Sequence, residues 1–298
     1  MQMGSTRFAF ILPVIAVLIW SLNIVVTRYV VDFISPLSIS FYRWLLAFIV
    51  LTPFMVVPVW RHRTQLLQLW PKLALLSAFG MVLYQGLAYT AAHYTTATNM
   101  GLINAFTPVF TIVIAIFILK EFPSPLTIMG CGISFAGLVL VITQGQFARL
   151  IDFGQYSGDL LMVLAVFLYA FYGVFLKKWQ ISLPVMVSLY IQILFALFYH
   201  LPFVYWQGLD ALNADNIGSV LYAGIFPSIF ATLFWMMAVQ RLGPNSTSIF
   251  MNFMPIFTAV IAYFWLAEQW GIYHTVGTVL TIFGVLLAQN NRFWQKEA

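Results

Sequence analysis

The sequence predicts an all-α membrane protein of ten transmembrane helices, arranged as two inverted five-helix repeats with both termini in the cytoplasm. Three observations carry this prediction: the composition, an internal repeat and the distribution of positive charge. Of the 298 residues, 62% are hydrophobic and only 7% are charged, whereas about 25% are charged in an average soluble domain. A chain of this length has room for about ten spans of ~20 residues and little else.

The internal repeat is a sixteen-residue segment that occurs twice. Phe106–Glu121 recurs as Phe253–Glu268, 147 positions later, with ten identities and no gap. Glycines further along coincide at the same offset, Gly130 with Gly277 and Gly137 with Gly284. The sequence therefore predicts two similar units, residues 8–143 and 156–290, that together form one transmembrane domain.

Apolar runs bounded by Pro, Gly and charged residues place the helices in order. The expected helices are 8–30, 36–60, 70–91, 96–119, 124–143, 157–178, 183–206, 215–240, 244–266 and 270–290. Arg7 precedes the first run, but that run is too long for a signal peptide and no small-residue cleavage site ends it. Pro123 and Pro125 separate the fourth helix from the fifth, and a polar turn at 268–271 separates the last two.

Orientation follows from the Lys and Arg residues in the connections, because cytoplasmic loops retain positive charge during insertion. Ten fall on one side of the expected bundle: Arg7, Arg61, Arg63, Lys72, Lys120, Lys177, Lys178, Arg241, Arg292 and Lys296. Only Arg28 and Arg149 fall on the other. Both termini are therefore expected in the cytoplasm. Since each repeat has an odd number of helices, the second copy enters the membrane from the opposite face.

Inverted repeats about an axis in the membrane plane are typical of carriers that work by alternating access. A duplication that merely enlarges a helix bundle is the alternative reading. A carrier needs polar and aromatic side chains deep in its spans and gathered on shared helical faces. Gln85 and Tyr89 share such a face, as do Ser228, Thr232 and Trp235.

These faces and the neighbouring aromatic residues define the expected site. The predicted substrate-binding residues are Gln85, Tyr89, Asn104, Ser228, Thr232, Trp235, Asn252, Trp20 and Tyr169. Pro108 and Pro255 are predicted as hinge or gating points, because proline removes a backbone hydrogen bond and opens carbonyls toward a cavity.

Charge within the spans is scarce. Arg43 is clearly internal, ~10 Å from the outer helix end at 1.5 Å per residue. It is placed either to attract a substrate carboxylate or to bond helix-end carbonyls and snorkel outward. Glu121 and Glu268 are expected as anchors at helix ends. No Asp or Glu lies in mid-span, so proton coupling through a buried carboxylate is not favoured, although His93 and His200 near helix ends are candidate titrating groups.

Several functions are excluded by what the chain lacks. It contains no G-x-x-x-x-G-K-[ST] loop, no H-E-x-x-H and no C-x-x-C, and its four histidines are scattered, so no metal site, cofactor or enzymatic activity is expected. The net charge of +5 reflects the cytoplasmic loops and does not indicate nucleic acid. The expected partners are a small-molecule substrate and the lipid bilayer, and a monomer is one oligomeric state that the sequence allows.

Motifs across the whole chain resemble the drug/metabolite transporter (DMT) superfamily with two EamA-type repeats. They are W-S-L-N at Trp20–Asn23, Pro36 followed by Arg43, and the twice-occurring pattern of a proline, a glutamate thirteen residues later and two glycines. The resemblance implies an inner-membrane exporter or facilitator of small metabolites, with a cavity between the third, fourth, eighth and ninth helices. Among its branches the chain is most similar to the YddG-type amino-acid exporters, which include carriers of aromatic amino acids.

The leading hypothesis is thus a carrier of small zwitterions such as amino acids. Three alternatives remain at this point. Other solutes, such as drugs, organic cations or sugars, are compatible with the same fold. A water-filled channel predicts conduction without saturation. An integral membrane enzyme acting on lipids would want clustered carboxylates, histidines or a metal, which this sequence does not supply.

Overall fold

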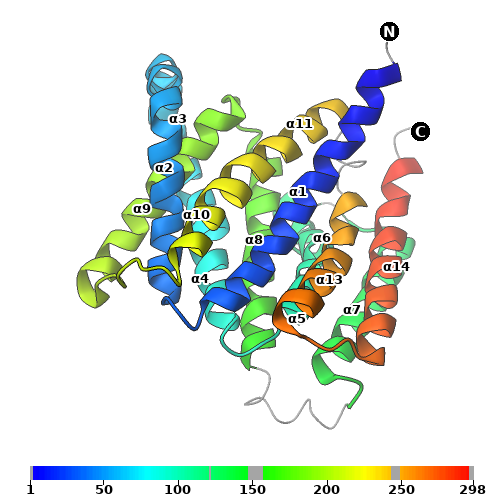
Figure 1. The fold of residues 1–298 in the computed structure, drawn as a ribbon. Coiled ribbons are helices and arrows are strands. Elements are labelled where there is room, and N and C mark those ends of the chain that lie inside the picture. The colour runs from blue at the N-terminus through cyan, green and yellow to red at the C-terminus, as the bar shows by residue number, and fades with distance from the viewer. Residues whose placement is uncertain (1–2, 121, 147–156, 243–248, 295–298) are drawn as a thin grey trace.

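The computed structural model describes residues 3–120, 122–146, 157–242 and 249–294, and within these ranges the chain is helical with no β-strand. The long helices are α1 (Met3–Val30), α2 (Pro36–Arg61), α3 (Arg63–Ser77), α7 (Pro125–Thr143), α8 (Ser157–Trp179), α9 (Val185–Gln207) and α14 (Ile272–Trp294). Shorter ones are α4 (Tyr84–Ala91), α5 (Ala97–Asn104), α6 (Thr107–Leu119), α10 (Ile217–Ile225), α11 (Thr232–Leu242) and α13 (Met254–Leu266). The first turn of α1 and the last turn of α14 lie on the same side of the bundle (Figure 1).

The all-α membrane prediction is confirmed at the level of helix length and composition. Within the described ranges, eight helical segments are long and apolar enough to cross a membrane, and two shorter apolar helices, Phe250–Leu266 and Ile272–Ala288, follow them. One expected boundary is wrong, because α3 begins at Arg63 and not at residue 70. Pro71 lies inside this helix and does not begin it.

Helix starts follow local sequence signals. Ser35 caps α2 by accepting a hydrogen bond from the Ser38 amide, and Ser124 caps α7 in the same way through Thr127. In both cases proline is the next residue, where its missing N–H is not needed by the helix. These caps fix where the chain enters two of the spans.

Four of the segments are irregular near their middle. Short π-helices, η1 (Ala78–Leu83) and η3 (Phe226–Ala231), join α3 to α4 and α10 to α11. The fourth expected helix breaks between α5 and α6, and a 3-10 turn, η4 (Ile249–Phe253), precedes α13. Pro108 and Pro255 each stand at the second position of the helix that follows the break. They start new helices and do not kink continuous ones.

The tightest packing in the bundle joins α7 to α14. A Cβ placed on Gly130 would lie 2.5 Å from the Gly284 carbonyl oxygen, and one on Gly137 would lie 2.7 Å from the Gly277 carbonyl oxygen. The two helices are therefore antiparallel and in backbone contact, with Ser134 and other small residues between the glycines.

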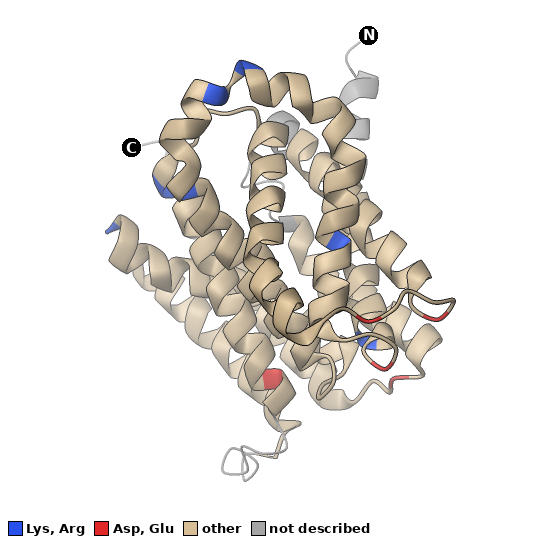
Figure 2. Ribbon diagram, turned by 90° about the vertical axis from the view of Figure 1, so that its left-hand side faces the viewer, with Lys and Arg blue, Asp and Glu red and all other residues tan. Residues whose placement is uncertain are grey.

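Charged residues separate along the bundle. Figure 2 shows most described Lys and Arg residues toward the end that carries the termini, and the described Asp and Glu residues toward the other end. Asp210 lies in the acidic region, where it accepts a hydrogen bond of 2.7 Å from the Ser35 amide. This distribution separates a basic end from an acidic end of the molecule.

Candidate substrate cavity

A cavity of about 480 Å³ lies between the irregular segments. It extends toward the basic end, because its lining includes Leu176 near the end of α8, Val185 at the start of α9 and Met236 on α11. Most of its wall is apolar and aromatic, with polar groups at a few points, as in small-molecule sites generally.

Most of the predicted binding residues come together at this cavity. Seven of the nine line it: Trp20, Gln85, Asn104, Tyr169, Ser228, Thr232 and Trp235. They come from both halves of the sequence and from five helical segments. These seven side chains therefore line one cavity, and their role in substrate binding stays a prediction.

The other four predicted site residues, Tyr89, Asn252, Pro108 and Pro255, are not among the lining residues, and their roles stay predictions. Tyr89 is almost completely buried behind the wall, with its hydroxyl 3.4 Å from Arg43 Nη1. Asn252 lies in the 3-10 turn before α13, where its side chain is buried away from the lining. Pro108 and Pro255, predicted as hinges, are also absent from the lining and stand at helix starts next to it.

Among the lining residues that the structure describes, Arg43 is the one with a formal charge. Its side chain is 3% exposed, and two of its three nitrogens have acceptors: Nε donates to Ser228 Oγ at 2.8 Å and Nη1 to Gln85 Oε1 at 3.1 Å. The guanidinium also lies 4.9 Å from the centre of the Trp44 ring. Among the described residues Nη2 has no acceptor, so this nitrogen is available to a ligand.

No carboxylate in the described part of the chain pairs with Arg43; the one ion pair found there joins Arg28 to Asp32. A buried charge without a counter-ion is costly, and an arginine held by neutral groups alone is well suited to bind an anion. The snorkelling alternative is not realised, because the guanidinium is held inside by Ser228 and Gln85.

Aromatic side chains form two parts of the wall. Trp20 and Trp235 lie with their ring centres 5.4 Å apart, and Trp20 Nε1 donates to the Pro227 carbonyl. In the second part of the wall, the ring centre of Tyr169 lies 4.8 Å from that of Tyr84 and 5.4 Å from that of Tyr172. Such rings offer large flat surfaces with polar edges.

Two lining residues, Asn23 and Gln192, carry buried amide oxygens without a hydrogen-bond partner. These atoms are Asn23 Oδ1 and Gln192 Oε1, and Gln192 Nε2 donates to Ser188 Oγ at 3.0 Å. Asn104 differs, since its Oδ1 accepts from the Tyr84 hydroxyl at 2.9 Å. The cavity therefore contains both a cationic donor and neutral acceptors.

Sequence reasoning missed Tyr84 and Met81 as lining residues. With Gln85 they follow i, i+3, i+4 spacing, which places all three on one helical face, and all three line the cavity. In the sequence an aromatic and an apolar residue on such a face are not distinguished from packing residues. Met251 and Met254 were also missed, since nothing distinguishes them from core methionines in the sequence. Arg43, Asn23 and Gln192 carried a signal, as polar residues deep in apolar runs.

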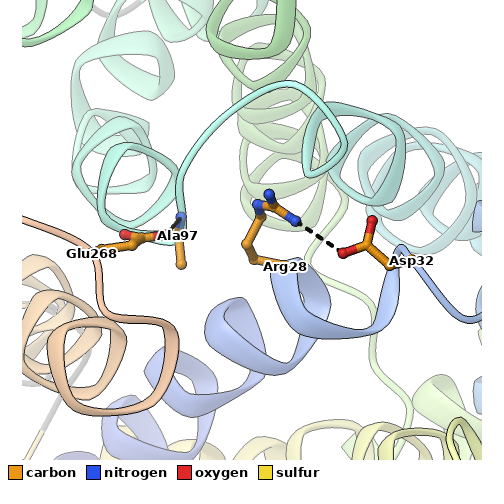
Figure 3. A network of polar contacts seen from close by, with 4 residues as sticks. All are labelled: Arg28, Asp32, Ala97 and Glu268. Atoms are coloured by element: carbon orange, nitrogen blue, oxygen red, sulfur yellow. Dashed lines mark hydrogen bonds and ion pairs between the residues drawn. The ribbon is translucent and has the colours of Figure 1, made fainter.

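At the acidic end, opposite the cavity mouth, polar contacts join the two halves of the chain. Glu268, between α13 and α14, accepts hydrogen bonds from the amides of Ala97 and Thr98 at 2.7 and 2.9 Å and from the Thr98 hydroxyl at 2.6 Å. Figure 3 shows this carboxylate at the start of α5, apart from the neighbouring Arg28–Asp32 pair. Glu268 thus acts as the helix-end anchor expected from the sequence; Glu121 lies outside the described residues.

Asp159 and His274 strengthen the same junction. Asp159, in the first turn of α8, accepts from Thr95 and from Asn99 Nδ2. Gly271 donates to His274 Nδ1, which leaves Nε2 as the donor to Asn99 Oδ1 at 3.2 Å. We call Glu268, Asp159 and His274, with their partners in the first half, the inter-repeat clasp.

No group of three or more His, Cys, Asp or Glu residues that could hold a metal ion occurs in the described ranges. The fold and the cavity define a helical membrane protein with an amphipathic cavity that extends toward its basic end. Two segments, residues 7–143 and 156–289, match the EamA-like transporter family, and the chain belongs to this family.

Curated relatives support the same class. An uncharacterized transporter of Archaeoglobus fulgidus is 26% identical over 93% of this chain and 96% of its own length. The uncharacterized transporter YyaM of Bacillus subtilis is 26% identical over 88% and 87%. A protein of Streptantibioticus cattleyicolor named "Probable terminal-alkyne amino-acid exporter" is 26% identical over 73% and 72%. One solved structure, 16% identical, has a TM-score of 0.66 over 97% of this chain and 99% of its own, which shows the shared fold.

Proposed function

We propose that this protein is a secondary transporter, an exporter or facilitator, that moves small metabolites, namely amino acids including aromatic ones, across the cell inner membrane. The observation that carries the proposal is Arg43, a buried guanidinium with a free nitrogen and no carboxylate partner among the described residues. A substrate carboxylate would complete its coordination by a charge-assisted hydrogen bond. The aromatic walls beside it would receive an apolar side chain.

The transport mechanism proposed is alternating access between two inverted five-helix repeats, with ten transmembrane helices and both termini in the cytoplasm. Two features support it. The cavity reaches toward the basic end, which the positive-inside rule makes cytoplasmic, and the inter-repeat clasp joins the halves at the other end. The structure would then be an inward-facing state of a carrier that works as a monomer.

Organic cations are disfavoured as substrates, because the one charge among the described lining residues is positive. Neutral sugars would leave the free nitrogen of Arg43 without an anionic partner. The name of the Streptantibioticus relative agrees with an amino-acid substrate. We therefore place amino acids ahead of other solutes.

The test is counterflow of labelled amino acids in proteoliposomes, with sugars and organic cations in the same panel and with and without a pH gradient. Saturable counterflow of amino acids is expected. Arg43→Gln should weaken amino-acid binding by about 10- to 150-fold, the equivalent of a charged hydrogen bond of ~1.5–3 kcal/mol, while Arg43→Lys should retain part of the affinity. No amino-acid counterflow by the wild type, or unchanged affinity in Arg43→Gln, would contradict the proposal.

A further inference from the structure

The cavity contains a second site that corresponds in position to the Arg43 site. Arg43 lies seven residues after the first residue of α2, and Gln192 lies seven residues after the first residue of α9. Their side chains line the same cavity. The two half-sites are thus equivalent in position and different in chemistry, since one has a guanidinium and the other a neutral amide.

The partners of the two residues differ in a matching way. Ser228, which accepts the hydrogen bond from Arg43 Nε, is the third residue of η3, and Gly80 is the third residue of η1. Gly80 offers no hydroxyl. A Cβ there would lie 2.7 Å from a ring carbon of Tyr172, so this ring occupies the space that a serine would need. A cation at position 192 would therefore lack the support that Arg43 has.

The second half-site presents acceptors and no positive charge. Gln192 is 3% exposed, its Nε2 is used by Ser188, and its Oε1 has no partner. Asn23 Oδ1, also in the lining, is likewise unpaired. Both oxygens are buried in this structure, so a ligand group with N–H donors would pair with them once the amide turns toward the cavity. A second carboxylate would be repelled by them and left without a counter-ion.

We infer that Gln192 determines specificity by accepting the ammonium group of the substrate and excluding a second carboxylate. The carrier then selects amino monocarboxylates over both dicarboxylates and simple monocarboxylates. This inference rests on the proposed function, because it takes Arg43 as the carboxylate site. It adds the residue and the chemical rule that decide between substrates of the same size.

Three probes that differ at one substituent test it: phenylalanine, 3-phenylpropanoate, which lacks the ammonium, and benzylmalonate, which has a carboxylate in its place. Their inhibition constants are measured against counterflow of labelled phenylalanine at constant pH on both sides of the vesicle, and their binding to the purified protein by calorimetry. The wild type should bind phenylalanine about tenfold or more tightly than either analogue, the effect of leaving charged groups unpaired.

Variants at position 192 should change these ratios in different directions. Gln192→Leu should lower the preference for phenylalanine over 3-phenylpropanoate about tenfold, and Gln192→Arg should raise the relative affinity for benzylmalonate. Gln192→Glu should keep phenylalanine and reject benzylmalonate more strongly, which provides a test that does not depend on the folding of the leucine variant. Gln68→Leu, at an exposed position on α3, is the matched control and should leave all three ratios unchanged.

The outcomes separate the two proposals. Amino-acid counterflow by the wild type together with unchanged ratios in Gln192→Leu and Gln192→Glu would overturn the role of Gln192 and leave the transport proposal standing. Loss of all counterflow in the wild type would overturn the proposed function and this inference with it.

Discussion

The inter-repeat clasp predicts that Glu268 controls access to the cavity from the acidic end. Its carboxylate makes three hydrogen bonds to Ala97 and Thr98, and these bonds exist only while the two halves are in contact there. Glu268→Gln keeps one carbonyl acceptor and loses the charge. Taking the range measured for helix N-caps, the closed arrangement should be weakened by about 0.5–2 kcal/mol, which changes the ratio of closed to open molecules by about 2- to 30-fold.

A cysteine in the cavity can report this change. Gly173 lines the cavity, and a Cβ at this position would meet no atom within 4 Å. In a Cys131→Ser background, Gly173→Cys should react slowly with a membrane-impermeant maleimide added from the acidic side. Adding Glu268→Gln should raise the labelling rate by about the same 2- to 30-fold, because labelling follows the open population.

The control is Asp32→Asn, which removes a neighbouring carboxylate from an exposed ion pair of 3.9 Å and leaves the clasp intact. Exposed pairs of this kind contribute about 0–1 kcal/mol, so the labelling rate should hardly change. Equal rates for Glu268→Gln and the parent would refute the reasoning, and so would an equal increase in Asp32→Asn.

Three further predictions concern packing, pH and the cavity wall. Gly284→Ala should destabilise the protein by about 1–3 kcal/mol, because its Cβ would lie 2.4 Å from the Ser134 amide nitrogen. Gly132→Ala, with open space around it, should be neutral or stabilising. Thermal unfolding in detergent measures both, and equal stabilities of the two variants would contradict the close packing of α7 on α14. Hydrogen bonds from Ser35 lower the pKa of the Asp210 carboxyl below its ordinary 3.8. The contribution of this carboxylate to stability is therefore present above pH 3.8 and is lost as the pH falls through the lowered pKa. Asp210→Asn should remove this acid dependence from the unfolding curves, and an unaltered pH profile would contradict the prediction. Trp235→Ala opens the tryptophan pair and should reduce amino-acid counterflow several-fold with normal membrane insertion; unchanged kinetics would remove Trp235 from the site.

Much of the fold could be predicted because hydropathy and proline act locally. The starts of α2 and α7 follow from a serine cap before a proline, and these signals are complete within four residues. The break before α6 was read as a proline bend, but the structure shows a new helix beginning at Thr107. Hydropathy and caps thus predict where the helical segments lie, whereas the breaks inside them depend on packing against other helices.

The cavity was predictable in part from polar side chains at helical spacing. Ser228 and Thr232 satisfied that spacing, although Ser228 lies within η3, and both line the site. Tyr84 and Met81 share a helical face with Gln85 and also line the site, but their residue types do not distinguish them from packing residues. The partner of Glu268 could not be foreseen either, since Ala97 lies 171 residues away in sequence and has no side chain that signals the contact.

The glycine contact between α7 and α14 bears on how such a chain could have arisen. The contact pairs Gly130 with Gly284 and Gly137 with Gly277, which are the repeat's own equivalent positions taken in reverse order. Each copy of the helix therefore carries a face that fits an antiparallel copy of itself. A single five-helix unit inserted in both orientations would already possess this self-complementary face, so two separate chains could have formed the pair before duplication and fusion joined them into one.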